Sequence, residues 1–189
     1  MSRRRSPLTE PYYLFAIFAA IALGTLALDQ SLRLGILWSA LALLSLLFRG
    51  RHDVEMGFSL ASVGRGALLG LAVSSPLLAF LWRDLRALSE RLYDTSDIAI
   101  LLYQVCFVSA PVEEYFLRGI VQPRTGLLQS VAIGTLIALL AFVRSTPILV
   151  LAIVVGYAAL ANVIYAYTRS RHGLAASIAC HISVGFCCR

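Results

Sequence analysis

An apolar run that carries two adjacent carboxylates decides the fold class of this chain: residues 98–119 read IAILLYQVCFVSAPVEEYFLRG. The carboxylates are Glu113 and Glu114, and Arg118 follows four positions later. A carboxylate at the centre of a membrane helix costs roughly 2.5–3.5 kcal/mol on insertion scales. Two together are tolerated near an interface, in a watery cavity or in an ion pair. Intramembrane ionisable residues usually mark a functional site, so we look for the chemistry here.

The composition predicts a membrane protein. Apolar residues make up 59% of the 189 residues, charged residues 14%, and the mean hydropathy is +0.82. Soluble domains are typically about 25% charged. We predict an all-α, polytopic transmembrane bundle of six to seven helices, in one integral membrane domain. The expected spans are Tyr13–Leu28, Leu34–Phe48, Gly66–Trp82, Ile98–Val112, Leu127–Val143, Pro147–Tyr167 and Leu174–Cys188.

The distribution of arginine, in a chain without lysine, predicts the topology. If the N-terminus is cytoplasmic, most arginines fall inside, as the positive-inside rule requires. Those expected inside are Arg3, Arg4, Arg5, Arg49, Arg51, Arg65, Arg118, Arg124, Arg169 and Arg171, and those outside are Arg33, Arg83, Arg86, Arg91, Arg144 and Arg189. The net charge of +6 then reflects topology and contact with anionic headgroups. It does not indicate a nucleic-acid surface. We expect a bacterial cytoplasmic membrane protein.

The spacing around the glutamates predicts two different environments. Pro111 is expected to kink or open the helix just before them. Glu114 and Arg118 are four residues apart, in the order that favours an ion pair on a helix. Glu113 points about 100° away and has no partner nearby in the sequence. Neighbouring carboxylates in unlike environments are typical of sites with one reactive and one structural group. The alternative is a charged helix end solvated by the cytoplasm.

A histidine in the last expected span is the second polar feature. Intramembrane histidine is rare and usually paired, and Glu113 is the expected partner of His181 if their helices pack together. The alternative is a lone histidine bound to a backbone carbonyl. His52 and His172 lie in more polar stretches and are poorer candidates. A glutamate and a histidine across a wet pocket can activate water against a carbonyl.

These residues resemble a known family. Residues 111–119, PVEEYFLRG, are similar to the first motif of the CPBP intramembrane proteases: two glutamates, three residues and an arginine, commonly followed by glycine. This group contains CaaX prenyl endoproteases and bacteriocin-processing or immunity proteins, and is also called the Abi family. The order of the later helices, with a basic-glycine turn before the helix of His181, is also similar. We divide the chain into N-terminal helices and loops over residues 1–97 and a CPBP-like core over residues 98–189.

The resemblance implies a role for each site residue. Glu113 is then the general base that activates water, and His181 is the third-motif histidine that helps to stabilise the oxyanion. Glu114 and Arg118 form the supporting pair.

The chain departs from the family pattern at two places. Thr146 stands where the second motif, phenylalanine-three residues-histidine, has its histidine, and Gly185 stands where the third motif has a polar residue. Arg144 could supply positive charge to an oxyanion, and Asn162 or Ser183 could replace the missing amide.

Two functions remain open on the sequence. The first is an intramembrane endopeptidase, a hydrolase that cleaves a membrane-associated or C-terminal-tail substrate with a glutamate-activated water. The second is a catalytically weakened relative that acts by binding, as a bacteriocin immunity factor or regulator. A small transporter that uses Glu113 as a proton site is a third possibility, without the paired broken helices of that class. We expect no cofactor, since the residues offer too few ligands for a convincing zinc site. The expected partners are the bilayer and a peptide or membrane-anchored protein substrate.

Overall fold

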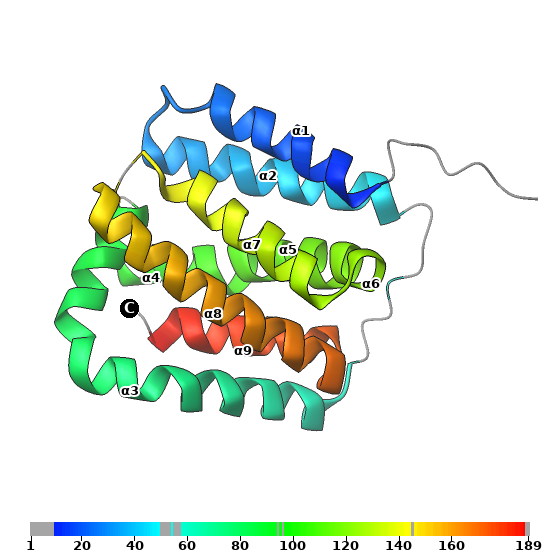
Figure 1. Cartoon of the computed structure of the whole chain (residues 1–189). Coiled ribbons are helices and arrows are strands. Elements are labelled where there is room, and N and C mark those ends of the chain that lie inside the picture. The colour runs from blue at the N-terminus through cyan, green and yellow to red at the C-terminus, as the bar shows by residue number, and fades with distance from the viewer. Residues whose placement is uncertain are drawn as a thin grey trace, which may run out of the picture.

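The computed structural model describes residues 10–49, 54, 58–93, 95, 97–144 and 146–187. The described residues form seven helices and no strand (Figure 1), so the predicted all-α bundle is confirmed. The helical segments are α1 (Pro11–Gly24), α2 (Gln30–Arg49), α3 (Leu60–Tyr93), α4 (Ile98–Tyr103), η2 (Gln104–Ser109), α5 (Ala110–Glu114), η3 (Tyr115–Val121), α6 (Gln122–Thr125), α7 (Leu127–Phe142), α8 (Ile148–His172) and α9 (Leu174–Cys187). Segments α4 to α6 run on without a break as one helix over Ile98–Thr125. Arg3, Arg4, Arg5, Arg51, His52, Cys188 and Arg189 lie outside the described residues.

Local sequence signals fix the ends of the helices around the glutamates. Asp97 caps α4, because its carboxylate accepts hydrogen bonds from the backbone N–H of Ala99 at 2.8 Å and of Ile100 at 3.4 Å. Gly126 and Gly173 have φ of 89° and 91°, a conformation that L side chains rarely adopt. Each of these glycines ends one helix and lets the next begin at once, so α6–α7 and α8–α9 are tight corners.

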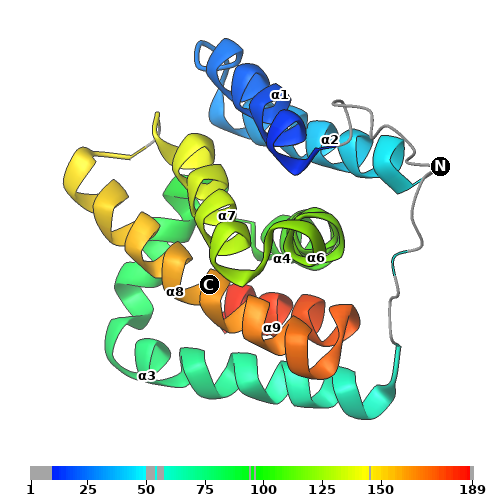
Figure 2. The same cartoon turned by 45° about the vertical axis from the view of Figure 1, so that its right-hand side comes forward.

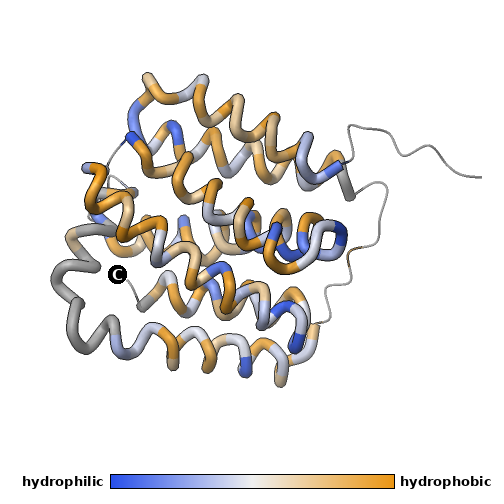
Figure 3. The backbone as a smooth tube through the Cα atoms, in the orientation of Figure 1, coloured by the Kyte–Doolittle hydropathy of each residue, from blue (hydrophilic) through white to orange (hydrophobic). Residues whose placement is uncertain are grey.

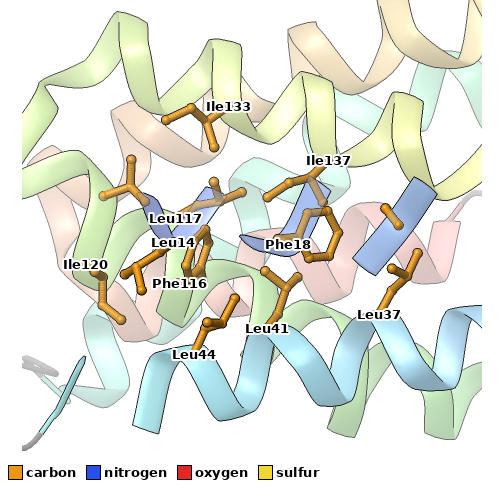
Figure 4. Close-up of a cluster of buried hydrophobic side chains, with 12 residues drawn as sticks. Leu14, Phe18, Leu37, Leu41, Leu44, Phe116, Leu117, Ile120, Ile133 and Ile137 are labelled. Atoms are coloured by element: carbon orange, nitrogen blue, oxygen red, sulfur yellow. The ribbon is translucent and has the colours of Figure 1, made fainter. Parts of the chain in front are cut away.

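The larger hydrophobic core fixes the glutamate helix against the N-terminal helices. Figure 4 shows Phe18 of α1, Leu41 of α2, Phe116 of η3 and Ile137 of α7 meeting between their helices. Each of these side chains is at most 5% exposed. Full burial of such a side chain is worth roughly 1.5–3 kcal/mol. The first two helices are therefore part of the same packed body as the helix that carries Glu113.

The described helices pack into a bundle whose outer surface is strongly apolar. Figure 3 shows that hydrophobic residues occupy much of the length of the described helices. Leu47, Phe107 and Ile148 are 69%, 73% and 82% exposed, which suits contact with lipid. Three helices in the described part are long and apolar enough to cross a membrane: Gln30–Leu47, Ile98–Thr125 and Ile148–His172. The shorter apolar helices, such as α1 with 14 residues, span roughly 21 Å at 1.5 Å per residue.

The arginines that the sequence places in the cytoplasm gather at one end of the bundle. The start of α3, the α6–α7 corner and the α8–α9 corner lie together there (Figure 1). This arginine-rich end carries Arg65, Arg124, Arg169 and Arg171. The side-chain amide Nε2 of Gln122, in α6, donates a hydrogen bond to the carbonyl oxygen of Ala166, in α8, at 3.0 Å. This bond joins the two helices that lead into these corners.

At the opposite end of the bundle, one helix is longer than the span that was expected for it. The span predicted to end at Trp82 continues as α3 to Tyr93, so the polar stretch after Trp82 is helical for most of its length. Pro76 lies within this helix. Arg33, near the start of α2, is fully buried at this end of the bundle. Its guanidinium donates to the carbonyls of Ala141, at 2.5 Å, and Ala22, at 3.3 Å, because free carbonyls at helix C-termini attract a cation.

Helix α3 lies directly against α9, the helix that carries His181 (Figure 1, Figure 2). Glycines make this approach possible. A Cβ atom added at Gly70 would lie 2.6 Å from the carbonyl oxygen of Cys180 and 2.8 Å from the Cβ atom of Ser183. Gly66 faces the backbone of Ala176 in the same way. The first half of α3 therefore holds α9 in place through backbone contact.

Gly70→Ala should destabilise the protein, since one of the two backbones must move to admit the methyl group. Overpacking of this kind typically costs about 1–3 kcal/mol. Gly64→Ala on the same helix is the matched control, because nothing lies within 4 Å of its added Cβ. That change should be neutral or stabilising, by about 0.5–1 kcal/mol. Thermal denaturation of the purified protein in detergent measures both, and a Gly70→Ala protein as stable as Gly64→Ala would contradict this packing.

Candidate active site

The helix that carries the glutamates is locally widened on both sides of them. Two π-helical segments, η2 and η3, flank the short α5 that contains Pro111, Glu113 and Glu114. A π-helical turn has one more residue per hydrogen-bonded ring than an α-helical turn, and such turns are frequent at functional sites. The expected opening of the helix near Pro111 therefore takes the form of π-helix rather than a break.

Glu114 is the centre of the polar cluster. Its carboxylate is fully buried and lies 3.5 Å from the Nε atom of Arg118, which confirms the predicted ion pair. Two residues of α9 complete its environment. Ser177 Oγ donates to Oε2 of Glu114, and His181 Nδ1 lies 3.1 Å from Oε1. A buried charge is stable only when paired and hydrogen-bonded, and both oxygens of Glu114 meet this condition.

The guanidinium of Arg118 ties three helices together. Nη1 donates to Ser130 Oγ of α7 at 2.5 Å. Nη2 donates to the side-chain and backbone oxygens of Asn162 of α8, at 2.6 and 2.9 Å. The structure therefore gives Asn162 a different place from the expected one: it binds the supporting arginine. Gly134 makes room for this contact, because a Cβ atom there would collide with the amide of Asn162.

Glu113 faces away from this cluster, toward α2. It is partly exposed, and Oε1 accepts a hydrogen bond from the indole Nε1–H of Trp38 at 3.0 Å. Its other oxygen, Oε2, has no hydrogen-bond partner among the described residues. The two adjacent carboxylates thus differ as predicted. Both oxygens of Glu114 have hydrogen-bond or ion-pair partners, whereas Oε2 of Glu113 has none among the described residues.

The predicted pairing of Glu113 with His181 is wrong, because the hydrogen-bond partner of His181 is Glu114. The helices of the two residues do pack together. The prediction assumed that the ion pair with Arg118 would occupy Glu114 and leave Glu113 for His181. One carboxylate offers about four acceptor positions, so Glu114 can bind Arg118 and His181 together.

The ring of His181 is held in a defined orientation. It stacks on Tyr165 of α8, with centroids 4.5 Å apart and an interplanar angle of 13°. An ionised carboxylate can only accept hydrogen bonds, so the Nδ1 atom that faces Glu114 carries a hydrogen. The opposite ring nitrogen, Nε2, is then the atom that can meet a substrate. The side chain is 18% exposed.

The remaining candidates from the sequence lie elsewhere. Arg144 is exposed and donates to the carbonyl of Leu28 in the α1–α2 turn, because α7 ends at Phe142, before the arginine. Thr146 follows the end of that helix and is buried. Ser183 donates to the carbonyl of Ala179 at 2.9 Å and lies against Gly70 of α3. The structure does not bring Arg144 or Ser183 to the glutamates.

Sequence reasoning missed four residues of the site. These are Trp38, Ser130, Tyr165 and Ser177. One of them had a usable signal, since Ser177 lies four residues before His181 and therefore on the same helix face. The other three come from helices distant in the sequence, and nothing in their spacing links them to the motif.

A metal centre is not assembled by the described side chains. None of their histidines, cysteines and carboxylates converge in a group of three that could hold an ion. Glu114 and His181 are within reach of each other, but the carboxylate is already occupied by Arg118 and Ser177. The donor set therefore does not fit a site with three protein ligands and an open position, and we derive no step through a metal.

The comparison with known families matches the segment that contains this cluster. Residues 95–187 match the family of type II CAAX prenyl endopeptidase Rce1-like proteins. This segment is an Rce1-like domain. The Rce1-like proteins are membrane proteases, hydrolases of peptide bonds. No curated protein and no solved structure matches the chain.

The Rce1-like domain contains most of the polar cluster but not all of it. It begins before α4 and ends with α9, so it includes Glu113, Glu114, Arg118 and His181. Helices α1 to α3 precede it. Trp38 therefore reaches Glu113 from outside the matched segment, and the α3 glycines that position α9 lie outside it too.

Proposed function

We propose that the protein is an intramembrane endopeptidase in which Glu113 activates the attacking water. The contrast between the two glutamates carries this proposal. Glu114 is buried and fully bound, whereas Glu113 is partly exposed and its Oε2 atom has no hydrogen-bond partner among the described residues. A general base must be within hydrogen-bond reach of the water that it deprotonates, and Glu113 Oε2 is the carboxylate oxygen of this cluster that has that freedom.

The proposed reaction uses these residues as follows. A water held by Glu113 attacks the carbonyl carbon of the peptide bond and gives one proton to the carboxylate. The negative charge on the tetrahedral oxygen is stabilised by His181, whose ring is anchored on Glu114 through Nδ1. The C–N bond then breaks, and Glu113 passes its proton to the leaving amine. Arg118 acts only through Glu114, by holding that carboxylate in place.

The substrate class that we propose follows from the family and from the position of the site. A C-terminal tail or a membrane-anchored protein would bring its scissile bond to a site within the bundle. We further propose that the arginine-rich end faces the cytoplasm of a bacterial cell, because basic loops are retained on that side. The alternative, a weakened relative that acts by binding, draws support from the absence of the second-motif histidine at Thr146.

Cleavage of an internally quenched, farnesylated CaaX peptide by the protein in liposomes tests the proposal. Wild-type protein should release the C-terminal tripeptide, identified by mass. Glu113→Gln should lower the rate by about 10²–10⁴-fold, the usual contribution of a general base. Glu10→Gln, before the first helix, is the matched control and should retain full activity.

The same experiment can reject catalysis. Equal cleavage by wild type and Glu113→Gln would contradict a role for this carboxylate. Absence of cleavage by wild type would favour the binding alternative, in which the isosteric Glu113→Gln protein should retain its cellular effect.

A further inference from the structure

Trp38 brings a single polar atom to Glu113 from outside the Rce1-like domain. The side chain belongs to α2 and is 7% exposed. Its Nε1–H donates to Oε1 of Glu113 at 3.0 Å. Buried indole groups usually find a hydrogen-bond acceptor, but this acceptor is one oxygen of the carboxylate on which the proposed chemistry depends. The contact therefore concerns the reactive centre as well as the packing.

The ring of Trp38 is held by the end of α3, which is itself held by the end of α7. It stacks on Tyr93 at the end of α3, with centroids 6.0 Å apart and an interplanar angle of 23°. Tyr93 in turn meets the ring of Phe142 at the end of α7, at 6.1 Å and 66°. Leu37 and Leu41 fix the same part of α2 in the hydrophobic core. A donor on a packed helix, with its ring stacked on a neighbour, keeps its direction, which is what a preorganised site requires.

We propose that Trp38 is a positioning residue that selects which oxygen of Glu113 acts as the base; this rests on the proposed function. An indole N–H can only donate, so it occupies Oε1 and cannot take the proton itself. Oε2 is left to bind water. Phe142 of the incomplete second motif supports this arrangement through Tyr93. The chain, which has Thr146 in place of the motif's histidine, thus supplies a polar contact to Glu113 from a different helix.

The chemistry of the contact explains why a neutral donor is sufficient. A hydrogen bond to an ionised carboxylate is roughly twice as strong as one between neutral groups. Without it, Glu113 is free to rotate about its side-chain bonds, and both oxygens compete for the water. Small displacements of a catalytic group lower the rate strongly, because the reacting atoms must be about 3–3.5 Å apart. Removing the hydrogen bond from Trp38 should therefore slow the chemical step and should not weaken substrate binding.

Trp38→Phe tests the proposal, because it keeps an aromatic ring and removes the N–H. With the farnesylated CaaX peptide, kcat per folded protein should fall about tenfold or more. KM should change less than about twofold, because the substitution removes no contact that binds the substrate in its ground state. Trp82→Phe is the matched control and should keep its kcat. A purely structural role would lower the folded fraction and leave kcat per folded protein unchanged, and this result would overturn the proposal.

A spectroscopic measurement tests the contact without any substrate. The chain contains two tryptophans, so Trp82→Phe leaves Trp38 as the one reporter. The indole N–H band in ultraviolet resonance Raman spectra should show a strong hydrogen bond, which Glu113→Leu should remove and Glu10→Gln should not. An unchanged band in Glu113→Leu would overturn the assignment.

The two measurements separate the possible failures. If the band responds but Glu113→Gln still cleaves the peptide, the proposed function is wrong, and with it the positioning role. If Glu113→Gln is inactive while Trp38→Phe keeps its kcat, the proposed function stands and Trp38 is only a packing partner of Glu113.

Discussion

Arg118→Ala should sharply reduce the amount of folded protein in the membrane. The change leaves Glu114 charged, fully buried and without its cation. It also leaves Ser130 and Asn162 without the donor that joins α7 and α8 to the glutamate helix. Removing one partner of a buried ion pair typically costs about 3–5 kcal/mol. This is a large share of the roughly 5–15 kcal/mol by which proteins are stable.

The prediction is checked by the yield of monodisperse protein and by its thermal midpoint in detergent. Glu114→Gln should partly rescue Arg118→Ala, because it removes the uncompensated charge. Arg118→Lys should lie between wild type and alanine, since an ammonium cannot reproduce the planar fork that meets both Ser130 and Asn162. Arg65→Ala, at an exposed position, is the control for loss of an arginine. Equal accumulation of Arg118→Ala and wild type would argue against the pair.

Glu113→Gln, His181→Ala and the double variant should lose similar amounts of peptidase activity. Each residue serves the same step in the proposed mechanism, one as base and one at the oxyanion. Groups of this kind contribute about 10²–10⁴-fold in rate each, and residues that act as a unit are strongly non-additive. In the cleavage of the farnesylated CaaX peptide, we therefore expect the double variant to be about as active as the less active of the two single variants.

Multiplied losses in the double variant would mean that the two residues act independently, against a shared step. A control is needed for the effect of His181→Ala on folding. His181→Ala removes the partner of Glu114 and the stacking on Tyr165, so its activity must be compared per folded protein. Tyr165→Leu removes the stacking alone and should leave a larger share of the activity than His181→Ala.

Much of the fold could be predicted from the sequence, because membrane helices follow from local composition. The apolar runs placed the seven helices, with most ends within a few residues of their positions, apart from the end of α3 and the end of the helix over Ile98–Thr125, which was expected at Val112. Both ends were missed because the polar residues after Trp82 and after Val112 were taken as the ends of membrane spans. Helical hydrogen bonds form within the chain and do not require apolar side chains, so the helix continues to Tyr93.

The sequence by itself determined the all-α membrane class, the resemblance of the motif and the Glu114–Arg118 pair, since a pair four residues apart meets on any helix. Only the tertiary structure decided which glutamate binds His181, and it joined Trp38 to Glu113 and Asn162 to Arg118. These contacts span 44 to 75 positions of the chain. Helix periodicity gives the face of each residue, but helix packing decides which faces meet. That packing is set by close contact of the Gly70 backbone with the backbone of Cys180, by the space that Gly134 leaves for the side chain of Asn162, and by burial of side chains such as Phe116.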